Sequence, residues 1–277
     1  MSKKNITNIV WLKRDLRLTD HLPLYNAIKK KQDLLILYIY EPSLMEDVHY
    51  DERHGRFIEQ SLSDIQEELL TYDKKLTVAF GEATEIFQIL IDRYCIKNIF
   101  SHEETGLKIS YLRDLELSLL FSKHNIAWNE YQSNAVTRGL TNRKDWEKHW
   151  NEVMRAPIEK INIVEVQILH HDFCQNNLPT FSAKKCYQKG GFKSAHLELK
   201  SFFINRGGEY FKNISKPEKS RHTCSRLSPY ISYGNISIRE VYKELLKSWN
   251  TPGWRRSMAA LSSRLHWHCH FIQKFES

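Results

Sequence analysis

Leu34-Leu35-Ile36-Leu37-Tyr38-Ile39-Tyr40 is the longest uninterrupted apolar run in the chain. An apolar run without polar alternation is typical of a strand that is covered on both faces, as in the centre of a parallel sheet. The run has seven residues, whereas a bilayer-spanning helix needs about 20. We therefore expect a central strand here and no transmembrane segment.

A strand-then-helix pattern repeats on both sides of this run. Strands are expected at residues 8–12, 34–40, 76–80, 98–102 and 126–131, and helices at residues 23–31, 52–72, 83–94 and 107–124. Parallel strands need crossover connections, which the intervening helices supply. The predicted fold class is α/β, with a five-stranded parallel Rossmann-like sheet whose ligand sites lie at the carboxyl ends of the strands.

The phosphate-binding fingerprints of nucleotide enzymes are missing from this pattern. The first strand is followed by Lys13-Arg14-Asp15-Leu16-Arg17 and not by GxGxxG, and no GxxxxGK[ST] occurs in the chain. An NAD-dependent or ATP-dependent enzyme is therefore not expected.

The second half of the chain has a different character. The periodic pattern fades over residues 136–191, and residues 192–277 are expected to be helical. We therefore predict an α/β domain at 5–135, an interdomain crossing at 136–191 and the first part of an incomplete all-helical domain at 192–277. The last helix is rich in aromatic residues, and little sequence remains to cover them, so the chain is expected to be cut short.

Local signals place the boundaries of three helices in this half. Gly207-Gly208 is expected to stop a helix over residues 194–206. Ser237 and Glu240 have the spacing of a capping box, which opens a helix over residues 238–249. Thr251-Pro252 is expected to cap the last helix, over residues 254–275, with proline at the first helical position.

Composition limits the surroundings and the partners of the chain. Its 41 Lys and Arg residues exceed its 33 Asp and Glu residues by eight, which favours an anionic partner such as nucleic acid. Its five cysteines are far apart and form no CxxC pair, which favours reduced thiols over a disulfide framework. The amino terminus lacks the apolar stretch of a secretory signal, so we expect a cytosolic protein.

Three motifs resemble the cryptochrome/DNA photolyase family. The stretch from Val10 to Asp20, VWLKRDLRLTD, resembles the start of the family, and Cys224 to Glu240, CSRLSPYISYGNISIRE, is similar to its flavin-phosphate motif TSRLSPYLxFGxLSxRE. Leu261 to Phe271, LSSRLHWHCHF, falls where the family has its E-L-x-W-R-E-F helix beside the flavin. The order and the spacing of the motifs agree over nearly the whole chain.

The resemblance implies a flavoprotein that repairs DNA with light. In the family, light excites reduced FAD, which donates an electron to a cyclobutane pyrimidine dimer flipped out of the DNA, so that the enzyme acts as a carbon–carbon lyase. FAD contacts are implied for six residues: Tyr210, Cys224, Ser225, Arg226, Leu227 and Ser228. The catalytic groups of relatives lie largely beyond the last residue, so this chain is expected to be inactive by itself and to be a monomer.

The lesion-contacting helix departs from the family pattern. Trp267 matches the tryptophan that stacks on the flipped dimer, but Arg264 replaces the glutamate that bonds the lesion, and His268-Cys269 replaces the Arg-Glu pair. We interpret Arg264, Trp267 and His268 as DNA-contacting residues, and the replacements leave the lesion preference open. A metal reading of His266-Trp267-His268-Cys269-His270 is rejected, because His268 points away from the face that His266 and His270 share.

The sequence leaves open the identity of an antenna chromophore and the choice between a photolyase and its alternatives. Gly106-Leu107 stands where folate-binding relatives carry an Asn-Glu pair, so a folate antenna is unsupported, and a deazaflavin or no antenna remains. The alternatives to a photolyase are a cryptochrome-like blue-light sensor without repair activity and a catalytically silent remnant in which only the α/β domain folds.

Overall fold

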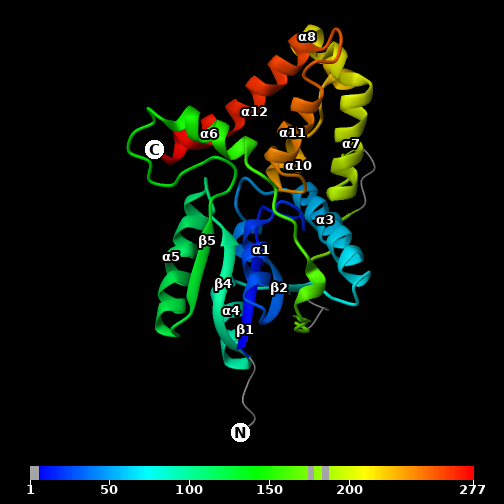
Figure 1. Ribbon diagram of the computed structural model, residues 1–277. Coiled ribbons are helices and arrows are strands. Elements are labelled where there is room, and N and C mark those ends of the chain that lie inside the picture. The colour runs from blue at the N-terminus through cyan, green and yellow to red at the C-terminus, as the bar shows by residue number, and fades with distance from the viewer. Residues whose placement is uncertain (1–5, 174–177, 183–186) are drawn as a thin grey trace. The chain divides into compact units, whose positions relative to one another are not determined.

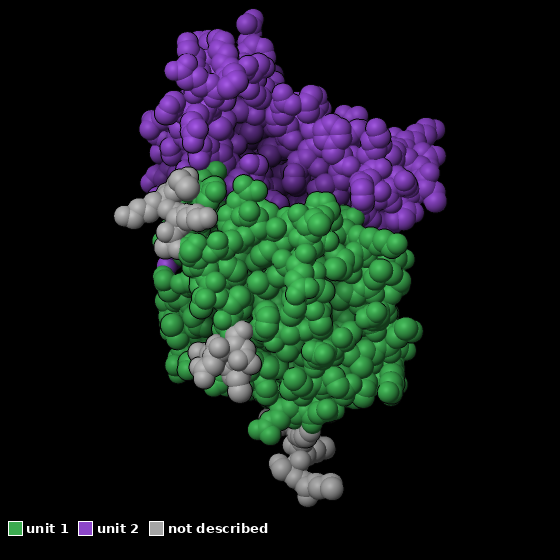
Figure 2. Space-filling view, turned by 180° about the vertical axis from the view of Figure 1, so that it is seen from behind, with its two compact units in different colours: residues 1–131, 159–191 green, residues 132–158, 192–277 purple. Residues whose placement is uncertain are grey.

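The computed structural model describes residues 6–173, 178–182 and 187–277, and it divides into two compact units. Unit 1 comprises residues 1–131 and 159–191, and unit 2 comprises residues 132–158 and 192–277 (Figure 2). The expected crossing over residues 136–191 is therefore not a separate segment, because its first part belongs to unit 2 and its second part to unit 1.

Unit 1 is built on a parallel sheet (Figure 1). Its strands β1 (Ile6–Leu12), β2 (Asp33–Tyr40), β3 (Thr77–Phe80), β4 (Cys95–His102) and β5 (Ala127–Tyr131) are ordered β3-β2-β1-β4-β5. The connecting helices are α1 (Leu22–Lys29), α2 (Pro42–Met45), α3 (Glu52–Leu70), α4 (Ala83–Arg93) and α5 (Lys108–Lys123). The order reverses between β1 and β4, which makes this a doubly wound α/β fold. The predicted fold class is confirmed.

The sheet has a sixth strand that the sequence did not indicate. Strand β6 (Ile168–Leu169) pairs in parallel with Leu34 and Leu35 of β2. It follows the short 3-10 helix η1 (Ile163–Glu165), and Lys74 Nζ donates to the carbonyl of Val166 beside it. These contacts explain why residues 159–191 belong to unit 1.

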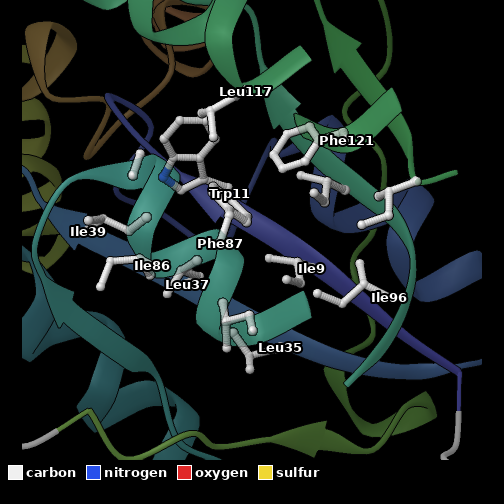
Figure 3. Packing of buried hydrophobic residues seen from close by; sticks show 14 of the residues in the cluster. Ile9, Trp11, Leu35, Leu37, Ile39, Ile86, Phe87, Ile96, Leu117 and Phe121 are labelled. Atoms are coloured by element: carbon white, nitrogen blue, oxygen red, sulfur yellow. The ribbon is translucent and has the colours of Figure 1, made fainter. Parts of the chain in front are cut away.

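One face of the sheet packs against α4 and α5 to form the core of unit 1. Trp11 lies at its centre, 5.2 Å from the ring of Phe87 in an edge-to-face arrangement, and Phe87 stands 4.9 Å from Phe121. Figure 3 shows these rings beside Leu117 and the apolar side chains of β1 and β2. Right-handed crossovers assign α1 and α3 to the opposite face.

Unit 2 is helical. It contains α6 (Trp146–Arg155), α7 (Phe192–Ile204), η3 (Arg206–Glu209), α8 (Tyr210–Asn213), α9 (Pro217–Thr223), α10 (Ser228–Ser232), α11 (Ile238–Lys247) and α12 (Arg255–Glu276). The sequence showed the apolar spacing of α6 at Trp146, Trp150 and Met154, all buried, but the prediction missed this helix. Trp150 packs 5.2 Å from the ring of Tyr242 on α11, so α6 belongs to the helical unit.

The observed ends of the helices show which of the predicted caps are present. The Ser237–Glu240 capping box is present at the start of α11. The last helix, α12, lies within one residue of the predicted range 254–275. The predicted cap is wrong, because residues 251–253 form a bend and turn and Trp254 is the N-cap, so proline is not at the first helical position. Gly207 and Gly208 lie inside η3, and α7 ends before them at Ile204. No helix in the described ranges combines the length and apolar character that a membrane crossing requires.

Candidate functional site

The loop from Cys224 to Ser228 joins α9 to α10 in unit 2. Arg226 has φ of 57°, in the left-handed region that costs a non-glycine residue roughly 1–2 kcal/mol. Ser225 Oγ accepts from the backbone N–H of Leu227 at 3.4 Å, and the side chain of Leu227 is buried. Leu227 therefore anchors the loop by packing, while the hydroxyl of exposed Ser228 faces solvent at the first turn of α10.

Arg206 holds this loop from η3. Its Nη1 donates to the carbonyl of Cys224 at 2.6 Å, and its Nη2 donates to the Glu198 carboxylate at 2.6 Å. Its Nε also donates to the hydroxyl of Ser201. A planar guanidinium that makes several charge-assisted hydrogen bonds fixes the backbone of the loop relative to α7. The sequence prediction missed Arg206, although its place before the Gly207-Gly208 pair was the available signal.

Tyr210 is buried at the start of α8, where it packs edge-to-face on Phe202 at 5.6 Å. Burial raises the pKa of Tyr210, against the lowering effect of the Arg264 guanidinium, and Cys224 raises it further. The structure therefore brings Tyr210, Cys224 and Arg264 into one neighbourhood, although they come from three separate segments.

The backbone before Tyr210 is held by the start of α12. A Cβ on Gly207 would lie 2.8 Å from Trp254 Cζ3, and one on Gly208 would lie 2.9 Å from Trp254 Nε1. Ser257 donates its hydroxyl to the carbonyl of Gly208 and accepts from the N–H of Phe211. The two glycines thus permit close approach of an indole, and this approach sets the position of Tyr210.

Arg264 and Trp267 form one exposed unit on α12. The Arg264 guanidinium lies 4.3 Å from the centre of the Trp267 ring, which is a cation–π contact. Trp267 is 44% exposed and presents the rest of its indole to solvent, whereas His268 is half-buried. This pair can stack on a planar group and offer it positive charge.

The neighbouring histidines have aromatic and arginine partners. His266 and His270 stack at 6.1 Å on one face of α12, as predicted, and His266 lies 5.0 Å from the ring of Trp150. Arg143 Nη2 lies 2.7 Å from His270 Nδ1. Burial and the nearby cation lower the pKa of His270.

A second candidate site lies in unit 1, among residues that the sequence prediction did not single out. Asp15 Oδ2 lies 2.6 Å from His102 Nδ1 and 2.9 Å from His21 Nε2, and all three side chains are buried. Within the described part of the chain, this is the one group with the composition and closeness of a metal site. The backbone N–H of Leu24 donates to His21 Nδ1, so the ring proton of neutral His21 sits on Nε2. An Nε2 that carries a proton is not a metal ligand, so the group is a buried polar triad around the Asp15 carboxylate.

Charged side chains surround Trp11 next to this triad. Lys13 Nζ lies 3.5 Å from Asp114 Oδ2 and 4.8 Å from the Trp11 ring, and Arg113 lies over the same ring. Arg113 pairs with Glu41 at 2.7 Å, yet burial raises the pKa of Glu41 to about 7. These groups stand at the carboxyl ends of β1 and β2, where the sequence predicted ligand sites for the fold.

A family model and several known proteins match this chain. Residues 8–151, which are just over half of the chain, match the family model described as DNA photolyase. The chain belongs to the cryptochrome/DNA photolyase family. The family match begins with β1 and spans the sheet that carries the buried triad.

Similar proteins share the fold at low sequence identity. The chain is 22% identical over 280 residues to cryptochrome DASH of Idiomarina loihiensis, covering 94% of the chain and 61% of the relative. It is 24% identical to a deoxyribodipyrimidine photo-lyase of Buchnera aphidicola, covering 88% and 54%. A Synechocystis cryptochrome structure superposes with a TM-score of 0.79 at 19% identity, over 100% of this chain and 62% of that one. The chain thus spans little more than half the length of these cryptochromes and photolyases.

Proposed function

We propose that the protein is a DNA photolyase-type flavoprotein in which reduced FAD drives the repair of pyrimidine dimers. The observation that carries the proposal is the anchored loop at residues 224–228. It carries the family's phosphate motif in a left-handed turn at Arg226, and Arg206 of η3 fixes it relative to α7. Such strain in a loop persists only where surrounding contacts over-determine it, and it is common at ligand clamps.

The residues present fit a bound dinucleotide. The hydroxyl of Ser228 is exposed and that of Ser225 is half-exposed, so both can donate to phosphate oxygens, and Arg226 adds a cation beside them. The phenol of Tyr210 lies close to Cys224 and Arg264, so it belongs to the same neighbourhood as the loop. When bound and reduced, FAD supplies the electron that light releases.

The charge of unit 2 supports a nucleic-acid partner. Its residues include 20 Lys and Arg against nine Asp and Glu, a net charge of +11, whereas unit 1 carries 21 and 24, a net charge of −3. The whole excess of positive charge therefore belongs to the helical unit. Arg264 and Trp267 add an exposed stacking surface suited to an unstacked base.

Retention of FAD tests the cofactor assignment. The purified chain is mixed with FAD, excess is removed by gel filtration, and the flavin absorption band is measured. We expect wild type to retain flavin and Ser228→Ala and Arg226→Ala to retain less. Ser215→Ala, at an exposed serine between α8 and α9, is the matched control and should behave as wild type. Equal retention by all four proteins would show that the loop does not hold the phosphates.

The second candidate function is a cryptochrome-like light sensor without repair activity. The observation that favours it is Arg264, whose guanidinium is engaged by Trp267 and cannot accept the hydrogen bonds that a carboxylate accepts. Light-dependent loss of dimers from irradiated DNA, measured with a flavin-loaded protein that spans the full length of the relatives, decides between the two. Repair supports the photolyase, and flavin photoreduction without dimer loss supports the sensor.

A further inference from the structure

Helix α5 of unit 1 has one face that is buried and one face that is exposed to solvent. Ser110, Asp114, Leu117 and Phe121 are buried toward the sheet, beside the edge strand β5 (Figure 1). The opposite face is apolar and exposed: Tyr111 is 58%, Leu112 47%, Leu115 48% and Leu119 74% exposed. Large apolar side chains that gather on the exposed side of a helix form a contiguous patch, and such patches mark interaction sites.

The exposed residues follow the spacing of a helix–helix seam. Lys108, Leu112, Leu115, Leu119 and Ser122 are separated by four, three, four and three residues. An average spacing of 3.5 residues keeps one row of side chains turned toward a partner helix along four turns. The row therefore favours another helix as the occupant over a flat sheet or an extended peptide.

The exposed charges of α5 select which helix fits. Lys108, Glu116 and Lys123 are the exposed charged side chains of the helix. Lys108 and Glu116 each lie four residues from Leu112, about 6 Å along the axis in opposite directions. If a two-fold axis passes near Leu112, Lys108 of each helix lies opposite Glu116 of the other, and Leu112 meets Leu112. Parallel pairing would instead place every charge against its own copy.

We propose that the outward face of α5 pairs in antiparallel fashion with α5 of a second copy of this chain. The seam is self-complementary, as a two-fold interface requires. The leucine row supplies apolar burial, and two Lys108–Glu116 pairs set the direction and register. The proposal replaces the monomer expected from the sequence and is independent of the flavin and DNA assignments.

The test is the oligomeric state of the full chain, measured by sedimentation equilibrium over a range of concentrations. We expect a reversible dimer, and Leu115→Glu should raise its dissociation constant at least about tenfold. Because Leu115 is exposed, the variant should keep the wild-type circular dichroism spectrum. Leu197→Glu, at a 69% exposed leucine on α7, is the matched control and should leave the dimer unchanged.

Charge reversal tests the antiparallel register. Lys108→Glu and Glu116→Lys should each weaken the dimer, and the double variant should restore it, because the pairs are re-formed with reversed sign. A monomer at all concentrations overturns the proposal, as does a dimer that Leu115→Glu leaves intact. If the double variant is as weak as the two single variants, the register is wrong.

Discussion

The buried His102 makes the stability of unit 1 dependent on pH. Burial lowers its pKa to about 4, although the hydrogen bond to Asp15 opposes the shift. Its unfolded value is about 6.5, so the unfolded state binds the proton first as pH falls. The stabilisation is complete above pH 6.5 and is lost between pH 6.5 and 4, by on the order of 3 kcal/mol at most.

The prediction is measured by urea unfolding of wild type and His102→Asn across this pH range. Asparagine keeps a donor near the Nδ1 position but does not titrate. The free energy of unfolding of His102→Asn should therefore fall less steeply on acidification than that of wild type. Comparing the two proteins cancels the opposite contribution of Glu41, whose raised pKa of about 7 lowers stability as pH rises from about 4.5 toward 7. His49→Asn, at an exposed histidine, is the control. Parallel pH profiles of wild type and His102→Asn would contradict the prediction.

Arg206 holds the loop at residues 224–228 through the Cys224 carbonyl. Replacing it by alanine removes the guanidinium contacts to Cys224, Glu198 and Ser201. A hydrogen bond to a charged group contributes about 1.5–3 kcal/mol, so we expect Arg206→Ala to weaken FAD binding by roughly tenfold or more. Fluorescence titration with FAD measures the change. Lys212→Ala, which removes an exposed cation of α8, should bind as wild type does, and an unchanged affinity of Arg206→Ala would exclude a positioning role.

At the scale of elements, the close packing of η3 on Trp254 sets a limit on side-chain size. Gly207→Ala would place a Cβ 2.8 Å from Trp254 and 3.0 Å from the carbonyl of Phe202. Overpacking of this kind costs typically 1–3 kcal/mol, and we expect a corresponding loss in the thermal stability of unit 2. Trp254→Leu removes the larger clash. The double variant Gly207→Ala, Trp254→Leu should therefore lose less thermal stability than the sum of the losses in the two single variants. Simple additivity would show that the contact is not the cause.

The sequence predicted well those elements that local sequence patterns determine, and it missed those that depend on tertiary contacts. The strands β1 to β5 and the helices α1, α3, α4 and α5 were predicted within a few residues, because apolar runs and amphipathic spacing report burial directly. Helix α2, with only four residues, was not predicted. Strand β6 has two residues, too few for any period, and it exists only through its pairing with β2. Thr251-Pro252 has the local chemistry of a helix start, but the packing of Trp254 moves the start to Arg255.

The candidate site was predicted in part, for the same reason. The motif loop could be found from its residues alone, whereas the hydrogen bond from Arg206 to the Cys224 carbonyl joins residues 18 positions apart. The triad likewise joins Asp15 and His21, which follow β1, to His102 at the end of β4. Such contacts are set by tertiary structure, so only the folded chain displays them.

At the scale of the whole molecule, the uneven distribution of charge predicts a salt-dependent affinity for DNA. Unit 2 carries a net charge of +11 and unit 1 a net charge of −3. Neutralising phosphates releases counterions, so the logarithm of the binding constant should fall linearly with the logarithm of salt concentration. We expect a slope that reports several phosphate contacts for undamaged duplex DNA, measured by fluorescence anisotropy between about 50 and 200 mM salt.

Removing single cations distinguishes a phosphate contact from a stacking contact. Arg255→Ala and Arg256→Ala, at exposed residues of α12, should weaken binding to undamaged and dimer-containing DNA alike if these arginines face phosphates, and each should reduce the salt slope by about one. Trp267→Ala should leave the salt slope unchanged and reduce the preference for dimer-containing DNA, because an indole stacks on a base and carries no charge. A change in salt slope with Trp267→Ala, or a preference for damaged DNA that survives it, would place the lesion contact elsewhere on unit 2.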